Sequence, residues 1–262
     1  MIITPNLKDK VALVTGGSRG IGAAVAVALA EAGAAVAVNY RERADAADAL
    51  VADLNKAGHR AVAIAADVSQ ASHVTKMFER VTAVLGPVDV LVNNAGIPGR
   101  TRFLDGDPRV IERLIRINYL GGVWCLRAFL PGLRAAAPSD VVNIVSVSGV
   151  VAEPRSGPYA ASKHAQLAFS RAAAAELRRE RIRVHTVKPG FTETEGFPQS
   201  WLPRRVQRVV SEPGEVAAHV LRSLEHGRGE TTVPWYYGPV GPLQDAMPNV
   251  FTRVLGGAPK AP

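Results

Sequence analysis

Short apolar, β-branched runs alternate with longer alanine-rich segments over roughly the first two hundred residues. This alternation is typical of repeated β-α units, which build a parallel sheet. Several runs are apolar throughout, as expected of strands that helices cover on both faces. The expected strands are Val11 to Thr15, Ala35 to Tyr40, Ala61 to Ala66, Val88 to Asn93, Val141 to Ser146, Ile182 to Lys188 and, more weakly marked, Thr231 to Pro234.

Segments of helical length separate these strands, and several of them end at a glycine, a common stop after the last turn of a helix. The pattern therefore predicts an α/β fold, a doubly wound sheet of about seven parallel strands with helices on both faces. The expected helices are Ile21 to Ala32, Ala44 to Ala57, Ser69 to Leu85, Pro108 to Leu130, Ser156 to Glu180 and Pro213 to His226.

The chain of 262 residues is expected to form a single domain, because α/β domains of this size commonly stay undivided. The segment Phe191 to Pro203 has no clear period and indicates a long functional loop. The last thirty residues hold six prolines, so we expect a mostly irregular tail from about residue 235, with one short helix near Leu243.

Basic residues outnumber acidic ones, 31 to 23, giving a net charge of +8. Such an excess can indicate a polyanionic partner. The densest arginine groups are not interleaved with aromatic residues as a base-stacking surface would be, so we expect solvated helix faces and no nucleic-acid partner. These groups are Arg178, Arg179, Arg181 and Arg183, and then Arg204, Arg205 and Arg208.

No stretch approaches the roughly 20 apolar residues of a membrane helix, and residues 1–10 lack the apolar region of a secretory signal. A cytoplasmic location is therefore expected. The single cysteine, Cys125, cannot form an internal disulfide. The six histidines are scattered and join no recognisable ligand set, so no metal site is expected.

A glycine-rich turn follows the first predicted strand and leads into a helix, the place where open α/β sheets bind dinucleotides. The tight turn needs Gly16, the close approach of a pyrophosphate needs Gly20, and close packing of helix on strand needs Gly22. Free N–H groups at the helix start attract the phosphate charge. The alternative is a turn with a structural role only.

The second predicted strand ends in Asn39-Tyr40-Arg41, where an NAD-preferring site usually has an acid for the ribose hydroxyls. Arg19 and Arg41 would suit the 2′-phosphate of NADP, because guanidinium groups match phosphate geometry. We therefore expect NADP(H) to be preferred, with NAD(H) possible. In the alternative interpretation, both arginines merely face solvent.

Tyr159 and Lys163 stand four residues apart on one predicted helix and so face the same side. A phenol is a poor base at neutral pH, but a nearby ammonium favours its ionised form. Ser146, at the end of the fifth predicted strand, would lie at the same sheet edge and could hydrogen-bond a substrate oxygen.

These motifs occur together with Asn93-Asn94-Ala95-Gly96, Asn118 and Pro189-Gly190. Over about Leu7 to Thr194 the chain resembles the short-chain dehydrogenase/reductase family. The resemblance implies a Rossmann-type sheet, with Tyr159 exchanging the proton and Ser146 polarising the carbonyl. It also implies that Lys163 holds the nicotinamide ribose and lowers the Tyr159 pKa.

The same resemblance implies that Asn118 completes a water-linked proton relay, although an asparagine that caps or bends a helix is the alternative. Two residues depart from the family's usual pattern. Thr192 stands where an aliphatic residue usually meets the carboxamide, and Tyr119 replaces the commoner leucine after the relay asparagine. The expected cofactor-binding residues are Gly16, Ser18, Arg19, Gly20, Ile21, Gly22, Tyr40, Arg41, Asp67, Val68, Asn93, Ala95, Gly96, Tyr159, Lys163, Pro189, Gly190, Thr192 and Thr194.

The expected activity is NADPH-dependent reduction of a ketone or 3-oxo substrate to a secondary alcohol, or the reverse. A fairly apolar substrate is expected from Phe197, Trp201 and Leu202 and from Val150 and Val151, unless the aromatic residues only pack the loop. Alternatives are an NADP-binding sensor or scaffold without turnover, and a lipid or steroid reductase held on a membrane surface by Arg204, Arg205 and Arg208. The resemblance also implies a homodimer or homotetramer formed through the helices at about 108–130 and 156–180.

Overall fold

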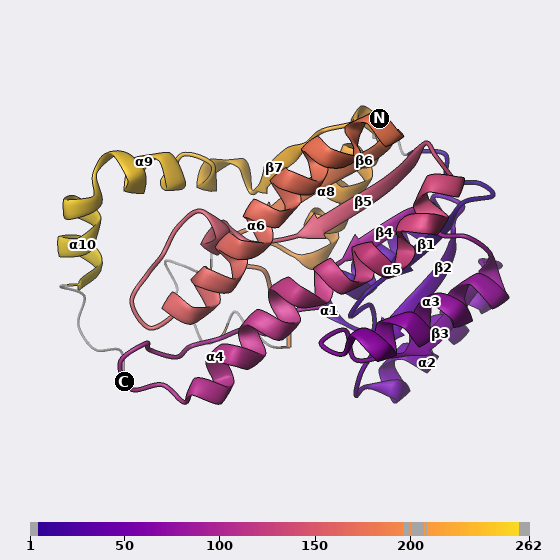
Figure 1. Ribbon diagram of the computed structural model, residues 1–262, viewed down its shortest axis with the longest axis horizontal. Helices are drawn as coiled ribbons and strands as arrows, with labels where there is room; N and C mark the ends of the chain where they lie inside the picture. The colour runs from indigo at the N-terminus through magenta and orange to yellow at the C-terminus, as the bar shows by residue number, and fades with distance from the viewer. Residues whose placement is uncertain (1–4, 196–199, 201–206, 208, 257–262) are drawn as a thin grey trace.

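The computed structural model describes residues 5–195, 200, 207 and 209–256. Seven strands form one sheet in the order β3-β2-β1-β4-β5-β6-β7, and every neighbouring pair is parallel. The predicted doubly wound α/β fold is confirmed (Figure 1). The strands are β1 (Val11–Val14), β2 (Ala35–Tyr40), β3 (Ala61–Ala65), β4 (Val90–Asn93), β5 (Ser139–Ile144), β6 (Ile182–Pro189) and β7 (Glu230–Val233).

Helices cover both faces of this sheet, which explains why several of its strands, β1 among them, are apolar throughout. One apolar cluster joins the sheet to the first set of helices, α1 (Gly20–Glu31), α2 (Ala44–Lys56) and α8 (Pro213–His226). A second cluster joins the opposite face to α3 (Ala71–Leu85), α5 (Gly121–Ala135) and α6 (Gly157–Leu177). In the second cluster the rings of Phe78 and Phe129 meet edge to face, with centroids 5.3 Å apart.

The strand order reverses beside β1, whose neighbours are β2 and β4. In open α/β sheets the loops at the carboxyl ends of the strands around such a reversal form the ligand crevice. The loops that follow β1, β2, β4, β5 and β6 all reach this edge, so the predicted site residues come from separate parts of the chain.

The helix expected over Pro108 to Leu130 is interrupted. The structure has α4 (Pro108–Ile115), a π-helical segment (Arg116–Leu120) and then α5. Such single π turns are frequent at functional sites, and this one carries Asn118.

The prediction of a mostly irregular tail from about residue 235 is wrong, because most of residues 235–256 are helical. Helix α9 (Val240–Ala246) is the short helix expected near Leu243, and a second helix, α10 (Pro248–Gly256), follows it. Pro242 lies in the first turn of α9 and Pro248 begins α10. Proline is compatible with these positions because the first N–H groups of a helix make no intrahelical hydrogen bond. Figure 1 shows these two helices extending from the body as an arm.

Candidate active site

The turn between β1 and α1 has the geometry that its glycines predict. Gly16 and Gly20 have φ of 59° and 56°, the left-handed region that favours glycine. A Cβ on Gly16 would lie 3.0 Å from Ala95 Cα, and one on Gly22 would collide with the Gly16 carbonyl oxygen. The first turn of α1 carries no acidic residue, so its N–H groups and positive dipole end suit an anion.

The end of β2 brings charged side chains beside this turn. Asn39 is buried; its Oδ1 accepts the Gly16 N–H at 3.2 Å and its Nδ2 donates to the carbonyls of Ile64 and Ala66. Asn39 therefore holds the backbone of the glycine turn in place against residues 64–66. Arg41 pairs with Glu42 and lies 3.9 Å from a carboxylate oxygen of Asp67.

Two further charged residues at this place were not anticipated. The carboxylate of Glu195 lies 3.0 Å from the Arg19 guanidinium and 3.5 Å from that of Arg43. Arg43 stands two residues beyond Arg41, which is a signal that sequence reasoning could have used. No local pattern links Glu195 to either arginine, because the contact joins the loop after β6 to those after β1 and β2.

The structure brings the side chains of Ser146 and Tyr159 together. Strand β5 ends at Ile144, two residues earlier than Ser146, whose Oγ accepts the Ser148 N–H at 3.0 Å and caps a short 3-10 helix. Burial raises the pKa of the Tyr159 phenol, and a hydrogen bond with the Ser146 side chain lowers it by a smaller amount. The phenol form therefore predominates at neutral pH.

Lys163 lies one turn along α6 from Tyr159, with its Nζ 6.0 Å from the centre of the Tyr159 ring. The ammonium donates to the Ile144 carbonyl at 3.2 Å and to Gln166 Oε1 at 2.9 Å. Because the ammonium has three N–H donors, one remains for a ligand. Burial lowers the pKa of Lys163 to about 7. Sequence reasoning missed Gln166, a buried residue one turn beyond the lysine.

Asn118 is buried in the π-helical segment and binds the loop that follows β4. Its Oδ1 accepts the Ile97 N–H at 2.8 Å, and its Nδ2 donates to the Ile97 carbonyl at 3.1 Å and to Ser162 Oγ at 3.0 Å. A Cβ on Gly96 would lie 3.3 Å from Asn118 Oδ1 and 3.7 Å from Lys163 Nζ. The asparagine thus joins the π-helical segment to α6 beside the lysine.

These groups converge at the sheet edge beside the glycine turn. Comparison with known proteins identifies the family. The family model for short chain dehydrogenases matches residues 10–203. The chain belongs to the short-chain dehydrogenase/reductase family. It is therefore an oxidoreductase of the kind that interconverts C=O and CH–OH groups with a nicotinamide cofactor.

Relatives of this short-chain dehydrogenase/reductase include the 3-oxoacyl-[acyl-carrier-protein] reductase of Synechocystis, 37% identical over 72% of this chain and 76% of that protein. An uncharacterised oxidoreductase of Methylorubrum extorquens is 40% identical over 72% and 76% of the two chains. Among solved structures, a Burkholderia cenocepacia short-chain dehydrogenase in complex with NADP has a TM-score of 0.80 and 32% identity. That comparison covers 87% of this chain and 97% of the other.

Other predicted cofactor residues of this short-chain dehydrogenase/reductase line the same edge. Thr194, from the loop after β6, would contact a Cβ on Gly20 at 3.2 Å. Asn93 is buried and donates from Nδ2 to Asn143 Oδ1 at 2.9 Å, so its side chain ties β4 to β5. Thr192 pairs with Ser211 in an isolated bridge that anchors the same loop.

Several predictions fall outside the described residues. The residues expected to cover the substrate lie outside the described part of the chain: Phe197, Trp201 and Leu202. The same holds for the arginines expected at a membrane surface: Arg204, Arg205 and Arg208. In the described part of the chain, no helix is both long and apolar enough to span a membrane. Within the same part, no three His, Cys, Asp or Glu side chains gather as a metal site would require.

Proposed function

We propose that this short-chain dehydrogenase/reductase catalyses the NADPH-dependent reduction of a ketone or 3-oxo substrate to a secondary alcohol. The observation that carries the proposal is the convergence of the Ser146 and Tyr159 hydroxyls and the Lys163 ammonium beside the glycine turn. The name of the Synechocystis relative favours a 3-oxo substrate. The proposal is tested by following the fall in NADPH absorbance when the protein is mixed with each of a panel of ketones.

Ser146 and Tyr159 would both donate hydrogen bonds to the substrate's carbonyl oxygen. Negative charge grows on this oxygen during reduction, and donors that are already in place stabilise it more than water would. Tyr159 then gives up its proton to form the alcohol. The raised pKa of the buried phenol keeps that proton in place at neutral pH, which suits the reductive direction.

The residues present fit a nicotinamide dinucleotide. The glycine turn leaves the start of α1 open for a pyrophosphate, and Lys163 retains an N–H for a ribose hydroxyl. When bound, the nicotinamide supplies the hydride. In its protonated form, Lys163 would also place positive charge beside the Tyr159 ring and favour release of the phenolic proton.

Preference for NADPH is proposed from the arginines that follow β1 and β2. Replacing Arg41 with alanine is expected to lower the ratio of kcat/KM for NADPH to that for NADH by about 10-fold or more, because a charge-assisted hydrogen bond contributes roughly 1.5–3 kcal/mol. Steady-state kinetics with both cofactors at one ketone concentration measures this ratio. An unchanged ratio would contradict the assignment.

The matched control is Arg109→Ala. The Arg109 side chain is 94% exposed on α4, so its loss should leave the cofactor ratio unaltered. A similar fall in the ratio for both variants would indicate a general loss of positive charge rather than a specific contact with the 2′-phosphate.

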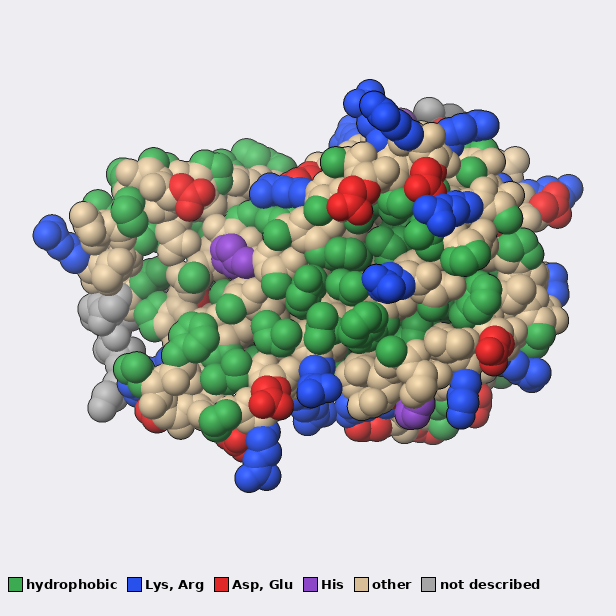
Figure 2. Space-filling model, viewed as in Figure 1, with side chains coloured by type: hydrophobic (Ala, Val, Ile, Leu, Met, Phe, Trp, Pro, Cys, Tyr) green, Lys and Arg blue, Asp and Glu red, His purple; other side chains and the backbone are tan. Residues whose placement is uncertain are grey.

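A homo-oligomer is proposed from the face that α4, α5 and α6 form. Figure 2 shows hydrophobic side chains gathered over the centre of this face, and the edge-to-face pair of Tyr119 and Phe169, with centroids 6.3 Å apart, joins the π-helical segment to α6. Light scattering after size-exclusion chromatography should give two or four times the chain mass of 27.7 kDa. A mass of one chain at micromolar concentration would contradict the proposal.

A further inference from the structure

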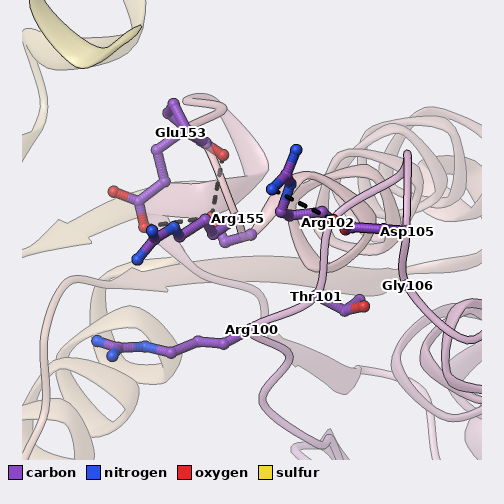
Figure 3. A pocket seen from close by; sticks show the side chains of 9 residues that line it. Arg100, Thr101, Arg102, Asp105, Gly106, Glu153 and Arg155 are labelled. Atoms are coloured by element: carbon purple, nitrogen blue, oxygen red, sulfur yellow. Dashed lines mark hydrogen bonds and ion pairs between the residues drawn. The ribbon is translucent and has the colours of Figure 1, made fainter. Parts of the chain in front are cut away.

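A cavity of about 530 Å³ lies at the start of α6 (Figure 3). Residues 100–102, 105 and 106, from the loop after β4, form one wall, and residues 153–156, from the loop before α6, form the other. This volume falls within the range of small-molecule sites.

The cavity adjoins the proposed reacting groups. Ser156 lines it, and the Ser156 carbonyl accepts the Ala160 N–H at 2.8 Å in the first turn of α6. Gly99, which directly precedes the other wall, is also close to the tyrosine, because a Cβ on it would lie 3.4 Å from Tyr159 Cβ. The cavity is therefore about one helical turn, roughly 5 Å along the axis, from the tyrosine.

Three arginines line the cavity, and their charges are only partly compensated. Arg102 forms an ion pair with Asp105 at 3.2 Å, and the Glu153 carboxylate accepts a hydrogen bond from Ser156 at 3.2 Å. Within the described ranges, Arg100 and Arg155 form neither an ion pair nor a side-chain hydrogen bond. Arg155 also has φ of 69°, a left-handed conformation that costs a non-glycine residue free energy and is concentrated at ligand sites.

The wall that carries Arg155 is held by the C-terminal arm. Gln244 of α9 exchanges two hydrogen bonds of 2.9 Å with the backbone N–H and C=O of Ala152. A Cβ on Gly241 would lie 2.9 Å from Val150 Cβ, so α9 also packs closely against the segment before this wall. The loop is thus fixed in place before any ligand arrives, which lowers the entropic cost of binding.

We infer that the substrate carries a carboxylate or phosphate at the end remote from its carbonyl, and that Arg100 and Arg155 bind this anion. The inference rests on the proposed function, since it places the carbonyl of the same substrate at Tyr159. Guanidinium groups suit both anions because their paired N–H donors match two oxygen acceptors. The substrate is then charged at one end, rather than the fairly apolar molecule that the sequence suggests.

Two matched pairs of ketones test the inference. The first pair is 4-acetylbenzoate and its methyl ester, which differ in a carboxylate. The second pair is acetoacetyl-4′-phosphopantetheine and acetoacetyl-pantetheine, which differ in one phosphate. In at least one pair the anionic member should have the higher kcat/KM, by about tenfold, and the pair that shows this identifies the anion.

The decisive variant is the double substitution Arg100→Gln and Arg155→Gln. It should remove most of the anionic preference and leave kcat/KM for the neutral member within about threefold of wild type. The matched control, Arg179→Gln, lies beyond the other end of the 21-residue helix α6 and should retain the preference. Equal efficiency for both members of both pairs, or an equal loss for both in the double variant, would overturn the inference.

A binding measurement separates this inference from the proposed function. Isothermal titration calorimetry of 4-acetylbenzoate and of 4′-phosphopantetheine with wild type and the double variant reports the anion site without turnover. If no ketone is reduced but an anion binds the wild type more tightly than the double variant, the proposed reaction fails and the anion site stands. Turnover of neutral ketones, with neither anion bound through the arginines, would leave the reaction standing and overturn the anion site.

Discussion

Tyr159→Phe is expected to lower kcat for ketone reduction by about 10³-fold, within the range that a positioned general acid contributes. The substitution removes only the hydroxyl that hydrogen-bonds with Ser146, so the ring and the backbone of α6 can keep their places. The Kd for NADPH should stay within a few fold of wild type. Single-turnover reduction with saturating NADPH, together with a fluorescence titration of the cofactor, measures both quantities.

The control for this result is Tyr119→Phe. It also removes one phenolic hydroxyl, and its ring packs edge to face on Phe169. Activity above about a tenth of wild type in Tyr159→Phe would show that another group supplies the proton. If wild type binds NADPH tightly yet reduces no ketone, the sensor or scaffold alternative gains support in place of the reductase.

The sheet could be predicted from the sequence because its strands are short, several are apolar throughout, and several of the helices between them end at glycine. Helices α8 and α1 likewise stand where the periodic segments place them. The break between α4 and α5 could not be predicted, because the π-helical segment accompanies contacts of Asn118 with Ile97 and Ser162 that exist only in the fold. Prolines in the tail were misleading, since a proline at a helix start is compatible with the helix.

The candidate site likewise has a part that the sequence predicts and a part that it does not. The sequence could group three of the site residues. Tyr159 and Lys163 share one face of a predicted helix, and Ser146 follows a strand that ends at the same edge of the sheet. Glu195 between Arg19 and Arg43, and the cavity with Arg100 and Arg155, depend on loops that meet only in three dimensions. These loop contacts are where the chain's specificity for cofactor and substrate is proposed to lie.

The pH dependence of stability should differ between wild type and Lys163→Met. Burial lowers the pKa of Lys163 to about 7, whereas a lysine in an unfolded chain has a pKa of about 10.4. Between these values the unfolded state binds a proton that the folded state does not, so the lysine's contribution to the unfolding free energy rises with pH, by up to about 1.4 kcal/mol per unit. Below about pH 7 both states are protonated and the contribution of the lysine is at its lowest.

The measurement is the Tm of the cofactor-free proteins at several values between pH 6.5 and 9.5. The Tm of wild type minus that of Lys163→Met should increase across this range by several degrees, since about 1 kcal/mol corresponds to roughly 2–4 °C for chains of about this size. The exposed Lys56→Met is the control and should give a constant difference. A constant difference for Lys163→Met as well would show that the pKa of Lys163 stays near its ordinary value in the fold, contrary to the effect expected of burial.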